Sequence, residues 1–382
     1  MNTRHIHLMM NMDWRFGRGI LNGLLRYNQQ YHCTWTVTCA IWQEKEVWDL
    51  QPGAPYDAVV GLFRDGPPEE NAHITSRTRV VNVGGVRQPV AGIPTVMADN
   101  DAIGAMAALH FREKGYPQLA FVSGRPTPAS EMRLEAFRAA AGGTVSSFVQ
   151  SYYGAEELRA FLSGLPAATG IFCHEDRDAL QVIRTLESMG RLVPEEYAVL
   201  GTNDDPLYNR LSPVPVSSID LRPEAIGYAA AEVLQQVFEG GTPPGITLIP
   251  PGELIPRRST DALAVADPKI RRLLRRLHDR ALEGTRVADL LESGDGSRRS
   301  VEMKFKQMLG RTLESELRRC RMEAAREQLL ESERSLQEIA AMCGFCNTPH
   351  FARMFRDTYG ATPGDYRKSN RRTVNLTDGS QL

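Results

Sequence analysis

The chain has 382 residues, which is too long for one ordinary core and fits two or three domains. Its opening apolar run is too short for a signal peptide, and no later segment approaches the roughly 18 apolar residues of a membrane span, so we expect a cytoplasmic protein with no membrane partner. Six cysteines are too few for a disulfide framework. The net charge is −1, yet residues 267–372 hold 23 Lys and Arg against 16 Asp and Glu, so a basic rear part follows an acidic front part. This division is typical of a sensor joined to a polyanion-binding domain.

The first 260 residues alternate short apolar segments with amphipathic ones, which predicts parallel β-sheets covered by helices on both faces. The expected strands are 6–10, 34–40, 58–63, 80–83, 119–122, 170–173, 198–201 and, after a Gly/Pro turn at 240–245, 246–254. The expected helices are 19–30, 103–114, 131–141, 156–162, 177–189 and 223–239. From residue 267 onward only helical periods remain. We therefore predict an α/β domain over 1–261, an all-α domain over 262–373 and a tail over 374–382.

The segment VMADNDAIGAMAALHFREKGYPQLAFVSG, which begins at Val96, carries the first family resemblance of the chain. Further matches follow in order at 133–137, 170–176, 201–205, 211–213, 217–219 and 258–260. Together they resemble the sensor domain of the LacI/GalR repressors. The resemblance implies a periplasmic-binding-protein-like fold, in which two doubly wound lobes hold a small ligand, usually a sugar or a purine, at the carboxyl ends of their strands.

By the same resemblance, Arg133, Asp176 and Asn203 are the expected polar ligand contacts, with Asp204 beside them. Planar Asp, Asn and Arg groups can bond vicinal hydroxyls in pairs, while an aromatic ring from Trp14 or Phe16 would cover the apolar sugar face. For Arg133 the alternative is a surface ion pair, and for Asn203 and Asp204 it is turn chemistry. Asn203 stands where the family usually has an acidic residue.

Two patterns in the front part resemble enzyme motifs. Gly17, Gly19 and Gly23 look like a dinucleotide fingerprint, but the third glycine comes one residue late and an acidic ribose ligand is missing. His174 and Glu175 start a zinc-helix pattern, but Asp178 stands at the position of its second histidine. We therefore expect no enzyme activity, no cofactor and no metal.

The strongest pattern in the rear part begins at Ser335, which forms a predicted capping box with Glu338 before a short amphipathic helix that stops at Gly344. Asn347 can cap a second helix in which Phe351 and Phe355 mark a buried face. This is a helix-turn-helix over about 335–358, and a similar unit lies at about 287–309. With the following GATPGDYR segment, the rear part resembles the AraC/XylS family of DNA-binding proteins.

That resemblance implies that the second helix of each unit reads double-stranded operator DNA. The expected DNA contacts are Arg298, Arg299, Glu302 and Met303 in the first unit, and Thr348, Pro349, His350 and Arg353 in the second. For Lys306, Arg318 and Arg326 we favour a solvated helix face. The turn at Gly294-Asp295-Gly296 departs from the family pattern and is expected to weaken the first unit. The CxxC spacing of Cys343 and Cys346 lacks the further ligands that zinc needs.

A LacI-type sensor with an AraC-type reader resembles the activators of sugar operons, which implies xylose or a related pentose as the effector. We also expect a homodimer, with RNA polymerase as a partner of the activator. Two alternatives stay open: an NAD-dependent oxidoreductase built on the front part, and a DNA-binding regulator whose front part serves only to dimerise.

Overall fold

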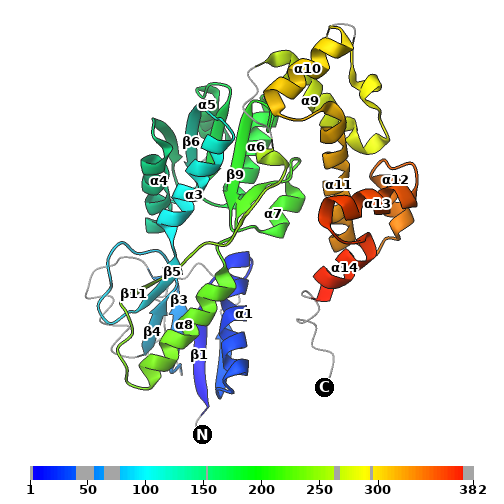
Figure 1. Cartoon of the computed structure of the whole chain (residues 1–382). Coiled ribbons are helices and arrows are strands. Elements are labelled where there is room, and N and C mark those ends of the chain that lie inside the picture. The colour runs from blue at the N-terminus through cyan, green and yellow to red at the C-terminus, as the bar shows by residue number, and fades with distance from the viewer. Residues whose placement is uncertain are drawn as a thin grey trace. The chain divides into compact units, whose positions relative to one another are not determined.

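A computed structural model describes residues 3–39, 56–63, 78–151, 154–261, 267–292 and 296–372. Contacts within the chain define two compact units, Met1–Ala264 and Val265–Leu382 (Figure 1). The predicted boundary after Asp261 lies three residues before this division. Ala40, the expected tail over 374–382, and residues 294 and 295 of the predicted turn lie outside the described residues.

The first lobe of the front unit is a parallel sheet whose strands are short, apolar and largely buried. Its strand order is β11-β5-β4-β3-β1-β2, with β1 (Arg4–Met9), β2 (Trp35–Cys39), β3 (Ala58–Gly61), β4 (Arg79–Asn82), β5 (Thr95–Ala98) and β11 (Ile246–Ile249). The helices α1 (Arg15–Gln30) and α8 (Pro223–Phe238) pack side by side on this lobe (Figure 1).

The second lobe has its own sheet in the order β12-β10-β9-β8-β6-β7. Its strands are β6 (Gln118–Ser123), β7 (Val145–Val149), β8 (Thr169–Cys173), β9 (Tyr197–Thr202), β10 (Ser217–Ile219) and β12 (Leu254–Ile255). Its helices are α3 (Asn100–Glu113), α4 (Pro128–Ala141), α5 (Ala155–Ser163), α6 (Asp176–Ser188) and α7 (Pro206–Leu211). All strand pairs of this sheet are parallel except β10 with β12.

The chain crosses between the lobes three times, after β5, after β10 and between β11 and β12. The prediction of one strand over 246–254 was wrong, because this segment divides into β11 in the first sheet and β12 in the second. Pro250 and Pro251 lie at the break, where their missing amide protons cannot extend a sheet ladder. Strands β5, β7 and β10 were not among the expected strands, and β7 is an edge strand whose Ser146 and Ser147 interrupt the apolar pattern.

Glycines bring α1 and α8 together at close range. A Cβ atom at Gly23 would lie 2.2 Å from the carbonyl oxygen of Glu224, and one at Gly227 would lie 2.2 Å from that of Ile20. A Cβ atom at Gly19 would likewise lie 2.5 Å from Pro223. The glycine pattern that resembles a dinucleotide fingerprint is therefore explained by helix packing, which is a structural reason to set the nucleotide-binding role aside.

The rear unit is entirely helical in its described part. It contains α9 (Pro268–Arg280), α10 (Arg298–Leu309), α11 (Leu313–Glu331), α12 (Leu336–Met342), α13 (Thr348–Tyr359) and α14 (Pro363–Arg372), with two 3₁₀ turns at Ala281–Glu283 and Val287–Leu290. The predicted fold class, a periplasmic-binding-protein-like α/β unit followed by an all-α unit, is confirmed. None of the described helices combines the length and the apolar character needed to cross a membrane.

Candidate ligand cleft and DNA-reading surface

The predicted ligand residues of the front unit stand next to strand ends at which the chain enters helices. Trp14 and Phe16 follow β1, Asp176 follows β8, and Asn203 and Asp204 follow β9. In doubly wound sheets these carboxyl ends are where ligands bind. Trp14 and Phe16 belong to the first lobe and the other three to the second, and a common ligand site between them stays a prediction.

Arg133 lies on α4 and is buried, with 4% of its surface exposed. Its Nε donates to Oδ1 of Asn100 at 2.9 Å, and its Nη1 donates to the carbonyl oxygen of His174 at 2.9 Å. Burial lowers the pKa of Arg133 to about 10, because removing the guanidinium from water disfavours its charge. Arg133 is therefore not the surface ion pair considered as its alternative, and its role in ligand binding remains a prediction.

Asp176 is buried at the start of α6 and connects three segments of the second lobe. Its Oδ1 accepts from the hydroxyl of Ser218 and its Oδ2 from the backbone amide of Asp205, each at 2.6 Å. Burial raises the pKa of Asp176 to about 7, more than these two bonds lower it. Both oxygens are engaged by the protein, so Asp176 positions the β9–α7 turn; direct ligand contact stays a prediction.

Asn203 and Asp204 form that turn, and both have left-handed backbone angles, with φ of 98° and 49°. Asp204 pairs with Arg257 at 2.7 Å, while the buried Oδ1 of Asn203 accepts no hydrogen bond from any described residue. Asn203 and Asp204 therefore have the turn conformation that the sequence suggested as the alternative to ligand contact. The Oδ1 atom of Asn203 nevertheless remains available to a ligand donor.

The sequence analysis missed two arginines that join the lobes. Arg15, the first residue of α1, donates through Nη1 to Asp220 at 2.9 Å and also to the carbonyl oxygen of Asn203. Arg125, which follows β6, lies over the ring of Trp14 with 3.8 Å between its Cζ and the ring centroid. Neither belongs to a motif; their position just after a strand end is the one signal that could have identified them.

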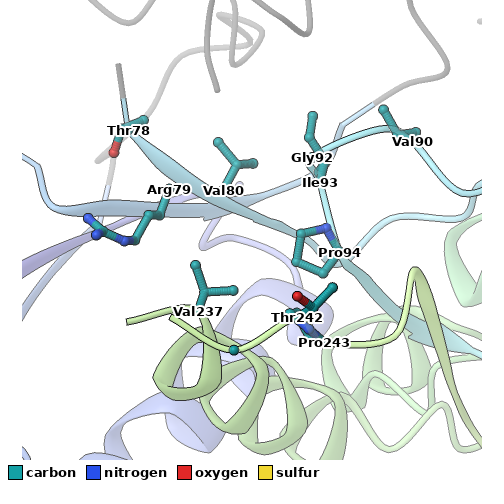
Figure 2. A pocket seen from close by; sticks show the side chains of 11 residues that line it. Thr78, Arg79, Val80, Val90, Gly92, Ile93, Pro94, Val237, Thr242 and Pro243 are labelled. Atoms are coloured by element: carbon teal, nitrogen blue, oxygen red, sulfur yellow. The ribbon is translucent and has the colours of Figure 1, made fainter. Parts of the chain in front are cut away.

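A cavity of about 550 Å³ lies elsewhere in the first lobe (Figure 2). It is lined at the start of β4, before β5 and at the end of α8, by residues that include Arg79, Ile93, Pro94, Val237 and Thr242. These are the amino ends of the strands, opposite the predicted ligand residues. None of those predicted residues lines this cavity.

In the rear unit, the second predicted helix-turn-helix consists of α12 and α13. The capping box is confirmed: the Ser335 hydroxyl accepts from the amide of Glu338 at 3.2 Å, and the Glu338 carboxylate accepts from the amide of Ser335 at 2.8 Å. Asn347 caps α13 through the amide of His350 at 2.8 Å. Phe351 and Phe355 are fully buried, which turns the opposite face of α13 outward.

Thr348 and His350 are half-buried on that outward face, and Pro349 and Arg353 are exposed. Arg353 forms no hydrogen bond or ion pair with any described residue. Its five donors are thus available to an external acceptor, as base reading requires.

The first predicted unit is less regular. Its leading helix is the 3₁₀ turn Val287–Leu290, a single short turn in place of an α-helix. On α10, Arg299 is exposed and has no described partner, Met303 is 67% exposed, and Arg298 pairs with Glu302 at 2.8 Å. Val301 and Phe305 are buried as expected.

Two clusters of metal-ligand types occur in the rear unit. His278, Glu316 and Cys320 have ligand atoms within 4.8 Å of one another, but the buried Glu316 also pairs with Arg311 and Arg319 at 2.5 and 2.8 Å. These guanidinium groups make the cluster an ion-pair network that repels a cation. At the CxxC spacing, burial raises the pKa of Cys343 to about 11, whereas thiol exchange and zinc binding use the thiolate.

Two family models match the chain: a periplasmic binding protein-like domain over residues 108–260 and a helix-turn-helix domain over residues 295–369. The xylose operon regulatory protein of Escherichia coli strain K12 is 28% identical over 96% of this chain and 98% of its own length. The protein of the same name from Haemophilus influenzae is 25% identical over 95% of this chain and 97% of its own.

Among solved structures, a xylose-binding transcription activator, xylR, matches with a TM-score of 0.78 at 26% identity, over 97% of this chain and 99% of that one. A cellobiose complex of the regulator CelR, at 23% identity and a TM-score of 0.56 over 68% of this chain and 85% of that one, shows the fold of the sensor alone. The resemblance to sugar-operon regulators is confirmed by the matches over nearly the full length. The chain thus combines a periplasmic binding protein-like domain with a C-terminal helix-turn-helix domain, and over nearly its full length it is similar to DNA-binding, sugar-responsive transcription regulators.

Proposed function

We propose that this regulator binds operator DNA through α10 and α13 and that a small sugar held between the sensor lobes controls this binding. The observation that carries the proposal is the presence of two helix-turn-helix units in which Arg299 and Arg353 present exposed, unpaired guanidinium groups. Arginine reads guanine O6 and N7 in the major groove in a bidentate manner. The names of two relatives point to xylose or a related pentose as the sugar.

In this proposal the other expected contacts on α10 and α13 border the two arginines. Met303, with two thirds of its surface exposed, offers an apolar contact of the kind that suits a thymine methyl group. Glu302 must release Arg298 before it can accept from a cytosine amino group. Lys306 and Arg318 are exposed on the helices, and we assign them to solvent or to phosphate.

We further propose an activator that works as a homodimer in the cytoplasm, contacts RNA polymerase and has no catalytic activity. Support comes from the relative described as a transcription activator and from the helix-packing role of Gly19 and Gly23. Titration with NADH tests the enzyme alternative: binding at the first loop would contradict this part of the proposal.

DNA reading is tested by selecting bound sequences from a random duplex pool and then measuring affinity for the selected site at fixed salt. Arg353→Ala and Arg299→Ala should each weaken binding by about 10- to 100-fold and relax the preference at one base position, since each loses a bidentate contact. Arg318→Ala, an exposed arginine outside the reading helices, is the matched control and should change affinity only a few-fold. Unchanged affinity and base preference in both test variants would contradict the assignment.

Sugar control is tested by melting the protein in the presence of pentoses and hexoses, since a ligand that binds the folded sensor raises its melting temperature. All four tryptophans lie within the first 48 residues, so intrinsic fluorescence follows the sensor alone. A shift of several degrees with one sugar supports the proposal. If no sugar of any kind shifts the transition while DNA binding persists, the front unit serves only to dimerise.

A further inference from the structure

The cleft region contains a half-buried arginine whose hydrogen-bonding capacity is unused. Arg125 follows β6, and its guanidinium lies over the ring of Trp14, which belongs to the other lobe. Among the described residues, none accepts a hydrogen bond from this guanidinium or forms an ion pair with it. Its five N–H donors are therefore held in place by ring stacking without a polar partner.

Arg133 adds a second positive charge, which no acidic side chain contacts directly, although the nearby charge of Glu175 raises its pKa against the effect of burial. Its bonds through Nε and Nη1 go to the amide oxygen of Asn100 and to the ring and carbonyl of His174, all neutral groups. Its Nη2 forms no hydrogen bond with a described residue. A buried charge is costly unless it is paired, so this site favours an anion.

Both arginines act on the same place at the end of β8. The pKa of His174 is held well below its usual value, first by burial and then by the positive charges of Arg133, Arg125 and Arg177. His174 is therefore neutral and does not offset them. Glu175 lies 3.9 Å from Arg177 and offsets that third charge.

Four carboxylates near the strand ends are already engaged by protein donors, whereas Asp13, exposed in the loop after β1, has no described partner for its carboxylate. Asp176 accepts from Ser218 and the turn amide, Asp204 pairs with Arg257, Asp205 accepts from backbone amides including that of Leu207, and Asp220 pairs with Arg15. A neutral sugar needs acceptors for its hydroxyl protons as well as donors. The acceptors left for a ligand are the buried Oδ1 of Asn203 and the exposed carboxylate of Asp13, beside the free donors of Arg125 and Arg133.

We propose that the effector is an anionic sugar, one that carries a carboxylate or a phosphate group, and that Arg125 is the residue that selects it. The inference rests on the proposed sugar-sensing function and narrows its ligand class. Arg125 binds the anionic group, because a guanidinium matches carboxylate and phosphate oxygens in a bidentate manner. The sugar hydroxyls donate to Asn203.

The test measures tryptophan fluorescence and melting temperature of the full-length protein with matched ligand pairs: D-xylose against D-xylonate and D-xylose 5-phosphate, and D-glucose against D-glucuronate. Acetate and inorganic phosphate serve as anion-only probes. We expect an acidic sugar to bind at least 10-fold more tightly than its neutral parent and than the simple anion. The panel also shows whether the carboxylate or the phosphate is preferred.

Arg125→Gln should lower the ratio of the affinities for the acidic sugar and its neutral parent by about 10- to 100-fold, because it removes the charge-assisted contact. Arg125→Lys should retain part of the preference, which a merely structural role would not predict. Arg138→Gln, an exposed arginine on α4 that bonds Ser147, is the matched control and should retain wild-type affinity. Unliganded melting temperatures check that the variants are folded.

Two results would overturn the inference. If a neutral sugar binds the wild-type protein more tightly than its acid or phosphate, the ligand class is wrong and the sugar-sensing function stands. The same holds if Arg125→Gln leaves the acid-to-neutral ratio unchanged. If no sugar, acidic or neutral, binds at all, the inference and the proposed sensing function fail together.

Discussion

Asp176 is the residue at which the end of β8, the β9–α7 turn and β10 are connected. Its two carboxylate oxygens accept one hydrogen bond from the backbone amide of Asp205 and one from the hydroxyl of Ser218. A Cβ atom at Gly201 would lie 2.1 Å from its Oδ1. The pKa of about 7 means that the folded sensor retains a proton that the unfolded chain, with a value near 3.8, releases. At pH values below both pKa values, Asp176 is protonated in both states and has no effect on stability. As the pH rises from the unfolded to the folded pKa, the free energy of unfolding falls, and the loss is complete above about pH 7.

We therefore predict that the sensor loses stability between about pH 4 and pH 7, by on the order of 1–4 kcal/mol from this one group. Asp176→Asn should flatten this part of the profile, since it has no charge to bury. Urea unfolding followed by tryptophan fluorescence measures the effect, and Asp101→Asn, at an exposed position on α3, is the control. Parallel profiles for the wild type and Asp176→Asn would show that the carboxylate is ionised in both states.

At the scale of single residues, the sequence predicted candidate ligand positions but not how the protein holds each side chain, and their contact with a ligand stays a prediction. Arg133, Asp176 and Asn203 were predicted because they match family positions, Asp176 and Asn203 after strand ends and Arg133 within α4. Arg15 and Arg125 were missed because the partner of a guanidinium is set by the approach of two lobes, which leaves no local pattern in the sequence.

Among the elements, the contact of α1 with α8 depends on residues that lack a side chain. Gly23→Ala would place a Cβ atom 2.2 Å from the Glu224 carbonyl and 2.5 Å from the Tyr228 amide, both backbone atoms that cannot rotate away. We predict a loss of about 1–3 kcal/mol in sensor stability from this overpacking, measured by urea unfolding. Gly143→Ala, where nothing lies within 4 Å, should be close to neutral. A stable Gly23→Ala variant would mean that the two helices can separate without cost.

Most elements could be predicted because they carry local signals. The α12 capping box, the Asn347 cap and the seven expected strands before residue 202 were confirmed, whereas the buried strands β5 and β10 were not predicted. The prediction failed where the structure depends on residues far away in the sequence. Residues 246–254 divide between two sheets, and β7 is an edge strand with a partly polar sequence. The leading helix of the first helix-turn-helix unit is a 3₁₀ turn, which the spacing of its apolar residues did not distinguish from an α-helix.

For the whole molecule, the proposed control requires that the sugar and the DNA affect each other's binding. If the sugar tightens DNA binding by some factor, DNA must tighten sugar binding by the same factor. We predict a change of about 5- to 150-fold in sugar affinity when the selected operator duplex is present, measured by tryptophan fluorescence. A duplex of scrambled sequence is the control. Equal sugar affinity with and without operator would show that the two units work independently.

The three crossings between the lobes also set an order of assembly during synthesis. The first lobe needs α8 and β11, although its opening strand is made first, whereas strands β6 to β10 of the second lobe are complete by Ile219. The apolar face of α1, with Ile20 and Leu24, therefore waits for a helix encoded about 200 residues later. At ribosomal rates this wait lasts on the order of ten seconds or more. The lobe whose first strand leaves the ribosome first thus waits for α8 and β11, and α1 exposes its apolar surface throughout that wait.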